Sequence, residues 1–164
     1  MMAASNRIVI LGLGNILHSD DGAGARAAER LKEDSRLPGH VTVIEGGTLG
    51  LELLPDLWDC THLVVLDAVD VGEEPGSLVR LSGDQVHTLT GSGNVHQLGV
   101  ADLLVALRLL ARRPPQVVLL GIQPEDIDWG CTLSPLVQEA IPSLIEAALT
   151  EMNAIRQVEI TTQP

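Results

Sequence analysis

Two aspartates, Asp20 and Asp21, follow an apolar run and a Gly-x-Gly turn in the stretch RIVILGLGNILHSDDGAGARAAERL, residues 7–31. Carboxylate oxygens in such a loop would bind a cation, whereas a glycine-rich turn after a strand is typical of a phosphate-binding loop. Leu17 stands where the dinucleotide-binding motif G-x-G-x-x-G has its third glycine. Two negative charges ahead of the next helix would also repel a pyrophosphate. The loop therefore favours a cation, and nucleotide binding is the weaker alternative.

A third carboxylate and a histidine stand at comparable places further along the chain. Asp67 directly follows the apolar run LVVL, and His96 follows the glycine-rich stretch GSGN at the start of an apolar segment. Two carboxylates and one imidazole suit a divalent first-row metal such as zinc or nickel. Each residue also has a structural alternative, which is a helix N-cap for Asp20 or Asp21 and a hydrogen bond to a loop for Asp67. For His96 the alternative is a structural role at the helix N-terminus.

The elements that would position these residues are short runs of Val, Ile and Leu that alternate with amphipathic segments. This pattern predicts an α/β fold with a mostly parallel sheet covered on both faces. The expected strands are 7–12, 41–45, 62–67 and 116–121, with an edge strand at 77–82, and the expected helices lie near 22–34, 49–59, 96–111 and 134–151. If the first three strands have the order 2-1-3, Asp20, Asp21 and Asp67 flank the crevice where the strand order reverses.

Composition limits the classes of partner. The 164 residues fit one domain, 1–164, with a core of about 7–150 and a loosely held tail at VEITTQP. The formal charge of −12 would repel nucleic acid and anionic membranes. No apolar run approaches the ~20 residues of a membrane helix, and MMAASNR lacks a signal-peptide core. Two cysteines make no disulfide framework, so a reduced, cytoplasmic setting is expected.

The sequence contains neither a good candidate for a catalytic cysteine nor the common hydrolase motifs. Cys60 precedes a buried strand and is expected to be an inert thiol, and Cys131 has no base nearby in the sequence. The nucleophile elbow G-x-S-x-G and the zinc motif H-E-x-x-H are both absent. A cysteine-protease interpretation is therefore poorly supported.

The motifs together resemble the hydrogenase maturation proteases, whose signature is G-x-G-N-x-L-x-x-D-D/E-G-x-G. The first part of the match is ILGLGNILHSDDGAGARAAERL. It continues in order through EGGTLGLELL, HLVVLDAVDVGEEPGSL, HQLGVADLLVALRLL, GIQPEDIDWGCTLSP and LVQEAI. The resemblance covers about residues 7–150, and it is far more specific than a single glycine motif.

The resemblance implies a three-layer αβα sandwich and an endopeptidase that removes a C-terminal extension from the [NiFe]-hydrogenase large-subunit precursor after nickel insertion. It implies a site of Asp21, Asp67 and His96, which would bind nickel carried by the substrate, with zinc or cadmium able to substitute in vitro. Glu45 opens EGGT where many members have Asp, and Gly46 and Gly47 would then give a loop freedom to admit the substrate tail. Ser134, ahead of Pro135, would be a helix cap rather than a nucleophile.

Two mechanisms fit the resemblance. Nickel is either a tag by which the enzyme recognises a loaded precursor, or a Lewis acid that also assists hydrolysis; the absence of a zincin-type base favours the tag. The alternative function is a non-catalytic nickel-binding accessory protein of hydrogenase assembly. Because carboxylates ordinarily ionise well below neutral pH, we expect His96 to set the pH dependence of metal binding, with His18 as its rival.

Overall fold

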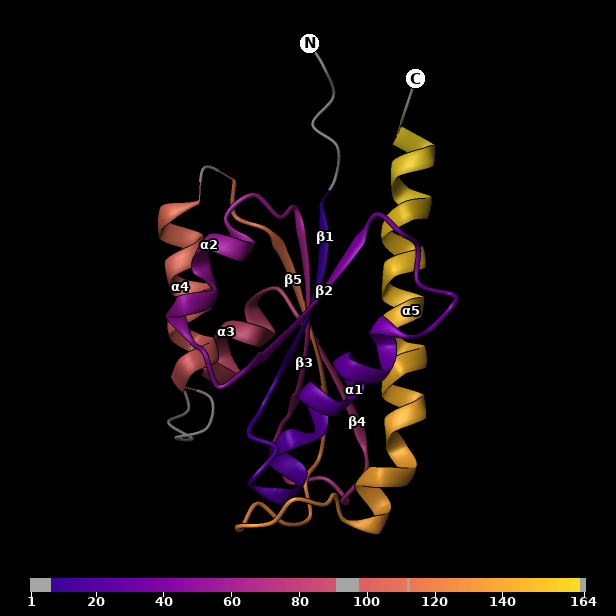
Figure 1. Cartoon of the computed structure of the whole chain (residues 1–164). Coiled ribbons are helices and arrows are strands. Elements are labelled where there is room, and N and C mark those ends of the chain that lie inside the picture. The colour runs from indigo at the N-terminus through magenta and orange to yellow at the C-terminus, as the bar shows by residue number, and fades with distance from the viewer. Residues whose placement is uncertain (1–6, 91–97, 112, 163–164) are drawn as a thin grey trace.

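A five-stranded sheet with helices on both faces forms the centre of the computed structural model, which describes residues 7–90, 98–111 and 113–162 (Figure 1). The strands have the order β2-β1-β3-β5-β4. Four of them are parallel: β1 (Ile8–Leu13), β2 (Val41–Gly47), β3 (His62–Ala68) and β5 (Gln116–Ile122). β4 (Leu78–Ser82) pairs antiparallel with β5 at one edge. The α/β class and the edge strand are confirmed, and the first three strands have the order 2-1-3 that was the condition for a crevice at the acidic residues.

Alternate residues of the central strands pack into two separate cores, which gives the molecule three layers. Ile8 and Ile10 pack with α1 (Ala23–Lys32) and α5 (Pro135–Thr162) on one face. Val9 and Leu11 pack with α2 (Leu54–Leu57), α3 (Asp84–Thr90) and α4 (Leu98–Leu110) on the other. Figure 1 shows these two groups of helices on opposite sides of the sheet. Burial on both faces explains why the strands are continuous apolar runs.

The helices differ from the predicted ones in three places. The segment expected as one helix at 49–59 is a 3₁₀ turn, η2 (Leu51–Leu53), followed by the short α2. Helix α3 was not predicted from the sequence. Helix α5 was expected to end near residue 151 but continues to Thr162, because Met152 is buried against the core and Ile155 packs beside it. The described part of the chain contains no helix with the length and apolar character needed to cross a membrane.

Close contact between α1 and the sheet fixes the position of the acidic loop that precedes this helix. A Cβ atom at Gly24 would lie 2.1 Å from the carbonyl oxygen of Leu66 in β3. Gly14 has a φ of +117°, and a Cβ there would lie 1.8 Å from the carbonyl oxygen of Asp21. Gly14 and Gly24, two of the four glycines of the signature, are therefore required by close backbone approach, not by a phosphate.

Candidate functional site

Asp21 and Asp67 lie together where the parallel strands have their carboxyl ends. We call this end of the sheet its carboxyl edge. The chain leaves β1 through a 3₁₀ turn, η1 (Ser19–Gly22), which contacts β3, and Asp67 lies near the end of β3. Since β1 and β3 are neighbours and the chain proceeds in opposite directions from them, this is the point where the strand order reverses. Both side chains are buried, with 7% of Asp21 and 6% of Asp67 exposed.

The two carboxyl groups are coupled electrostatically. Burial, together with the negative charge of Asp21, raises the pKa of Asp67 to about 8. The backbone N–H of Ala68 donates to Asp67 Oδ1 at 2.8 Å and offsets part of this effect. Asp21 Oδ2 accepts a hydrogen bond from the N–H of Asn15 at 2.9 Å. Such a buried acidic pair would be relieved by a cation, as expected from the residue types.

Asp20, by contrast, is fully buried and holds a distant loop in place. Its Oδ2 accepts hydrogen bonds from the N–H groups of Glu125 and Asp126, at 2.9 and 3.0 Å, and from the hydroxyl of Ser134 at 2.8 Å. Its Oδ1 accepts from the N–H of Ser134 at 2.7 Å. The N-cap of α1 is Gly22, with no side-chain capping bond. The helix-cap alternative for Asp20 or Asp21 is therefore wrong.

Residues 123–134, here called the 123–134 loop, border the acidic pair. The loop begins where β5 ends beside β3, with Ala68 paired to Ile122, and it returns to η1. The N–H of Ser19 donates to the carbonyl oxygen of Gly130 at 2.8 Å, and the N–H of Gly130 donates to the carbonyl oxygen of Leu17 at 2.9 Å. Beyond the resemblance, the sequence indicated no role for this loop, because its partners lie more than 100 residues away in the chain.

His96, the third residue of the predicted site, lies outside the described residues. Within 7–90, 98–111 and 113–162, no group of three or more His, Cys, Asp or Glu side chains is arranged to hold a metal ion. His18, its rival, lies 3.2 Å from the carbonyl oxygen of Ile127 through Nδ1, and its ring packs on Trp129 with centroids 4.3 Å apart. Of the three predicted site residues, the described part of the structure therefore contains Asp21 and Asp67, which lie together.

The remaining candidate residues have structural environments. Cys60 is buried, and desolvation raises the pKa of its thiol to about 11, so the expectation of an inert cysteine is confirmed. Glu45 pairs with Lys32 at the surface, 2.5 Å apart. Gly46 and Gly47 belong to β2, not to a loop, and Gly46 packs closely against the Leu11 side chain. α5 begins at Pro135, and Ser134 binds Asp20, in agreement with a structural role.

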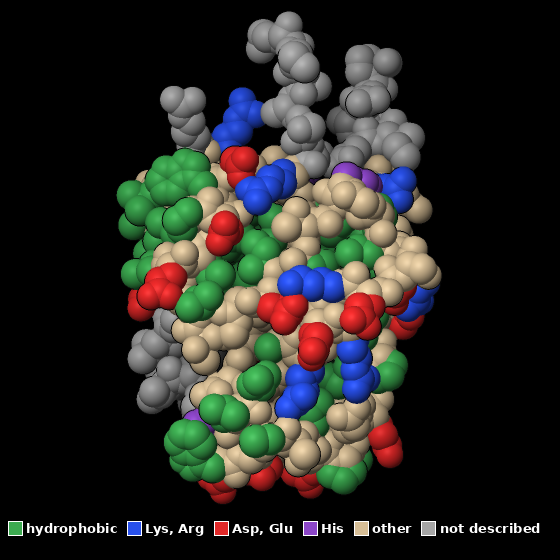
Figure 2. Space-filling view, in the orientation of Figure 1, with side chains coloured by type: hydrophobic (Ala, Val, Ile, Leu, Met, Phe, Trp, Pro, Cys, Tyr) green, Lys and Arg blue, Asp and Glu red, His purple; other side chains and the backbone are tan. Residues whose placement is uncertain are grey.

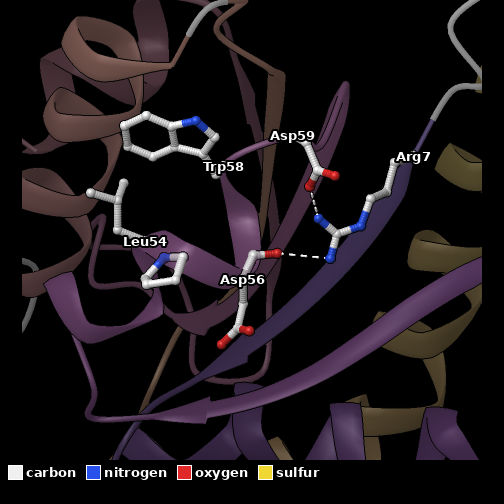
Figure 3. A pocket seen from close by; sticks show the side chains of 6 residues that line it. Arg7, Leu54, Asp56, Trp58 and Asp59 are labelled. Atoms are coloured by element: carbon white, nitrogen blue, oxygen red, sulfur yellow. Dashed lines mark hydrogen bonds and ion pairs between the residues drawn. The ribbon is translucent and has the colours of Figure 1, made fainter.

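A surface groove lies at the amino ends of the strands, which is the end of the sheet opposite to the acidic pair (Figure 3). It is lined by Arg7, Leu54, Pro55, Asp56, Trp58 and Asp59. Arg7 immediately precedes β1, and its guanidinium forms an ion pair with Asp59 and donates to the carbonyl of Asp56 at 2.9 Å. The amino ends of the strands meet there, so the groove is separate from the carboxyl edge, where Asp21 and Asp67 lie.

Comparison with known proteins gives a consistent result. Residues 25–151 match the family model described as hydrogenase maturation protease. The chain is 42% identical over 146 residues to the hydrogenase expression/formation protein HupD of Bradyrhizobium diazoefficiens, a match that covers 87% of this chain and 76% of that protein. It is 38% identical over 148 residues to the hydrogenase 2 maturation protease of Escherichia coli, covering 89% of this chain and 90% of that one.

Solved structures share the fold as well as the sequence. The hydrogenase maturating endopeptidase HybD of Escherichia coli superposes with a TM-score of 0.84 at 36% identity, covering 90% of this chain and 93% of that one. The [NiFe] hydrogenase maturation protease HybD of Thermococcus kodakarensis gives a TM-score of 0.74 at 31% identity, with 87% and 96% covered. The similarity extends over almost the whole of these single chains.

Proposed function

Because the chain belongs to the hydrogenase maturation protease family, we propose that it is an endopeptidase that removes the C-terminal extension of a [NiFe]-hydrogenase large-subunit precursor after nickel insertion. The observation that carries this proposal is the buried pair of Asp21 and Asp67 at the switch point of the sheet. The reduced, cytoplasmic setting expected from the two cysteines stays a prediction.

The acidic pair fits nickel presented by the precursor. Oxygen ligands from Asp21 and Asp67, with an imidazole from His96, would take part of the coordination sphere and leave positions for the ligands of the precursor itself. Burial has already removed water from the two carboxyl groups, and the raised pKa of Asp67 means that a second negative charge is unfavourable there without a partner. A cation would therefore replace the proton of Asp67.

Recognition of the metal would make cleavage conditional on correct loading. Nickel bound in the precursor would serve as a tag, and it would polarise the scissile carbonyl if it also assists hydrolysis. Asp21 and Asp67 would hold the loaded centre at the edge of the sheet, where the 123–134 loop borders it. No nucleophile motif is present in the sequence, which favours a role for the acids in positioning the scissile peptide.

We expect purified enzyme to cleave the nickel-loaded precursor and to leave both metal-free precursor and casein intact, because the acidic pair would bind only a segment that carries a cation. Gel electrophoresis and mass spectrometry of the products would measure this. Cleavage of metal-free precursor at the loaded rate would rule out the tag. Nickel binding without any cleavage would instead indicate the non-catalytic accessory role.

The affinity for nickel or zinc should fall as the pH is lowered from about 7.5 to about 5.5, because protons compete with the metal. An unperturbed histidine titrates at about 6.5, so His96 should contribute below that pH. The expectation that both carboxylates are ionised in this range is wrong for Asp67, whose pKa of about 8 makes it a second competing group. Each displaced proton changes the affinity by about tenfold per pH unit.

Calorimetric titrations at several pH values would separate the two groups. His96→Ala should bind more weakly at neutral pH and retain a slope of about tenfold per unit, set by Asp67. Asp67→Asn should lose that part of the slope, whereas His18→Ala should keep the wild-type slope. A slope lost only in His18→Ala would show that His18, and not His96, is the third ligand.

A further inference from the structure

Four large apolar side chains are exposed on the two segments that border the acidic pair. Ile16 and Leu17 precede η1 and are each 49% exposed, and Ile127 and Trp129 of the 123–134 loop are 41% and 79% exposed. We call these four residues the Trp129 platform. Figure 2 shows hydrophobic side chains beside a histidine at the lower end of the molecule, where Figure 1 places this loop. None of the four contributes to either core.

The backbone beneath the Trp129 platform is held rigidly. His18 and Gly130 form a parallel β-bridge between the two segments, and the Ser19 hydroxyl donates to the carbonyl of Asp128 at 3.0 Å. The ring of His18 packs against Trp129, and Asp20 holds the start and the end of the loop. An exposed tryptophan on a preorganised backbone is typical of a binding hot spot, because little conformational entropy is lost when a partner binds.

The surroundings of the platform identify its occupant. It is continuous with the turn that carries Asp21, so a polypeptide that presents a cation to the acidic pair would pass over it. Glu125, Asp126 and Asp128 are exposed in the same loop, and the chain has a net charge of −12. This charge favours a segment with basic side chains and no excess of acidic ones.

We propose that the Trp129 platform is the docking surface for the segment of the precursor that flanks the scissile peptide, and that this segment carries apolar side chains with basic neighbours. This inference rests on the proposed function and adds the surface by which the same site selects its polypeptide. Asp21 and Asp67 would bind the metal, and the Trp129 platform would bind the polypeptide segment that carries it.

Cleavage kinetics with the nickel-loaded precursor test the proposal. Trp129→Ala should lower kcat/KM by about 30-fold, the loss typical of a hot-spot residue, and mainly through KM. Trp129→Phe should recover part of the loss. Trp58→Ala is the matched control, since Trp58 is exposed in the groove at the other edge of the sheet, and its kinetics should equal those of the wild type. Circular dichroism should show all three variants to be folded.

Fluorine NMR gives a second measurement that does not require cleavage. The chain has only two tryptophans, so labelling with 5-fluorotryptophan gives one resonance from Trp58 and one from Trp129, which Trp58→Phe assigns. Adding unlabelled, nickel-loaded precursor should change the chemical shift of Trp129 and leave that of Trp58 in place. If the wild type fails to cleave the precursor, the proposed function fails, and the NMR result still decides where the precursor docks.

Three results would overturn the proposal. The first is wild-type kinetics for Trp129→Ala, and the second is an unchanged Trp129 shift at saturating precursor. The third is a concentration-dependent dimer of the wild type that Trp129→Ala abolishes, measured by light scattering, because the platform would then be covered by a second copy of the chain. A monomer with a Trp129 shift specific to the precursor supports docking of the substrate.

Discussion

Replacing Asp67 with Asn should abolish processing of the precursor and, at the same time, stabilise the metal-free chain at neutral pH. Processing should be lost because an amide cannot supply the negative charge that would hold a cation beside Asp21. The fold should be preserved, because the amide has almost the same shape and its oxygen can still accept the hydrogen bond from the N–H of Ala68. Loss of function with a gain in stability is the signature of a residue retained for activity.

The gain in stability should depend on pH in a definite direction. The pKa of Asp67 is about 8 in the folded chain, raised from the ordinary aspartate value of 3.8 that the unfolded chain should show. Between these values the folded state binds a proton that the unfolded state has lost, so the free energy of unfolding falls as the pH rises, by at most about 1.4 kcal/mol per unit. Asn does not titrate, and its advantage over Asp67 should therefore grow from pH 5 towards pH 8.

Urea unfolding at four pH values in the presence of a chelator, beside cleavage assays of the same preparations, would measure both effects. Asp21→Asn is the companion variant. It should also be inactive, and it should reduce the pH dependence of stability, because it removes the negative charge that helps to raise the pKa of Asp67. Normal cleavage by either folded variant would show that the acidic pair is not the site.

Replacing Asp20 with Asn should destabilise the fold strongly, by about 3 kcal/mol, because it leaves buried donors unsatisfied. Four donors converge on this carboxylate. In either orientation of the amide, its NH₂ group would face at least one backbone N–H. Loss of a helix cap would cost only about 1 kcal/mol, so the size of the effect distinguishes the contacts of Asp20 in the structure from the cap that the sequence left open.

A matched control for Asp20 is available in the same loop. Asp128→Asn removes the same charge from an exposed side chain, and it should change the free energy of unfolding by less than about 0.5 kcal/mol. Chemical denaturation compares the two variants directly. Asp20→Asn should also slow processing, because it loosens the 123–134 loop, whereas equal stability of the two variants would contradict the role of Asp20.

Only the resemblance singled out Asp21 within the acidic loop. The pattern of apolar runs was sufficient to predict the strands and, on the condition that the first three have the order 2-1-3, the meeting of that loop with Asp67. These features follow from local periodicity and from the general geometry of parallel sheets. Helix α3, with the sequence DQVHTLT, was missed because seven residues with few apolar positions show no clear period. The end of α5 was placed too early because the contacts of Met152 with the core are tertiary and leave little trace in the local pattern.

The role of Asp20 could not be predicted for a related reason. From the sequence SDDG, only hydrogen-bond partners close to Asp20 in the chain can be inferred, and these suggest a helix cap. Its actual partners, from Glu125 to Ser134, are separated from it by 105 to 114 residues. Trp129 was equally inconspicuous, because an isolated tryptophan in a loop gives no period from which its exposure could be inferred.

The long separation in sequence between Asp20 and its partners has a consequence for folding of the chain during translation. β1 and η1 are made early, but the loop that completes the surroundings of Asp20 and Asp21 is made only after β5, near the other end of the chain. Local helices can form during translation, whereas contacts across such distances must wait for the later segment. A nascent or truncated chain that ends before Ser134 would thus lack part of the hydrogen bonding around Asp20, and the surroundings of the acidic pair would be complete only once the 123–134 loop has been made.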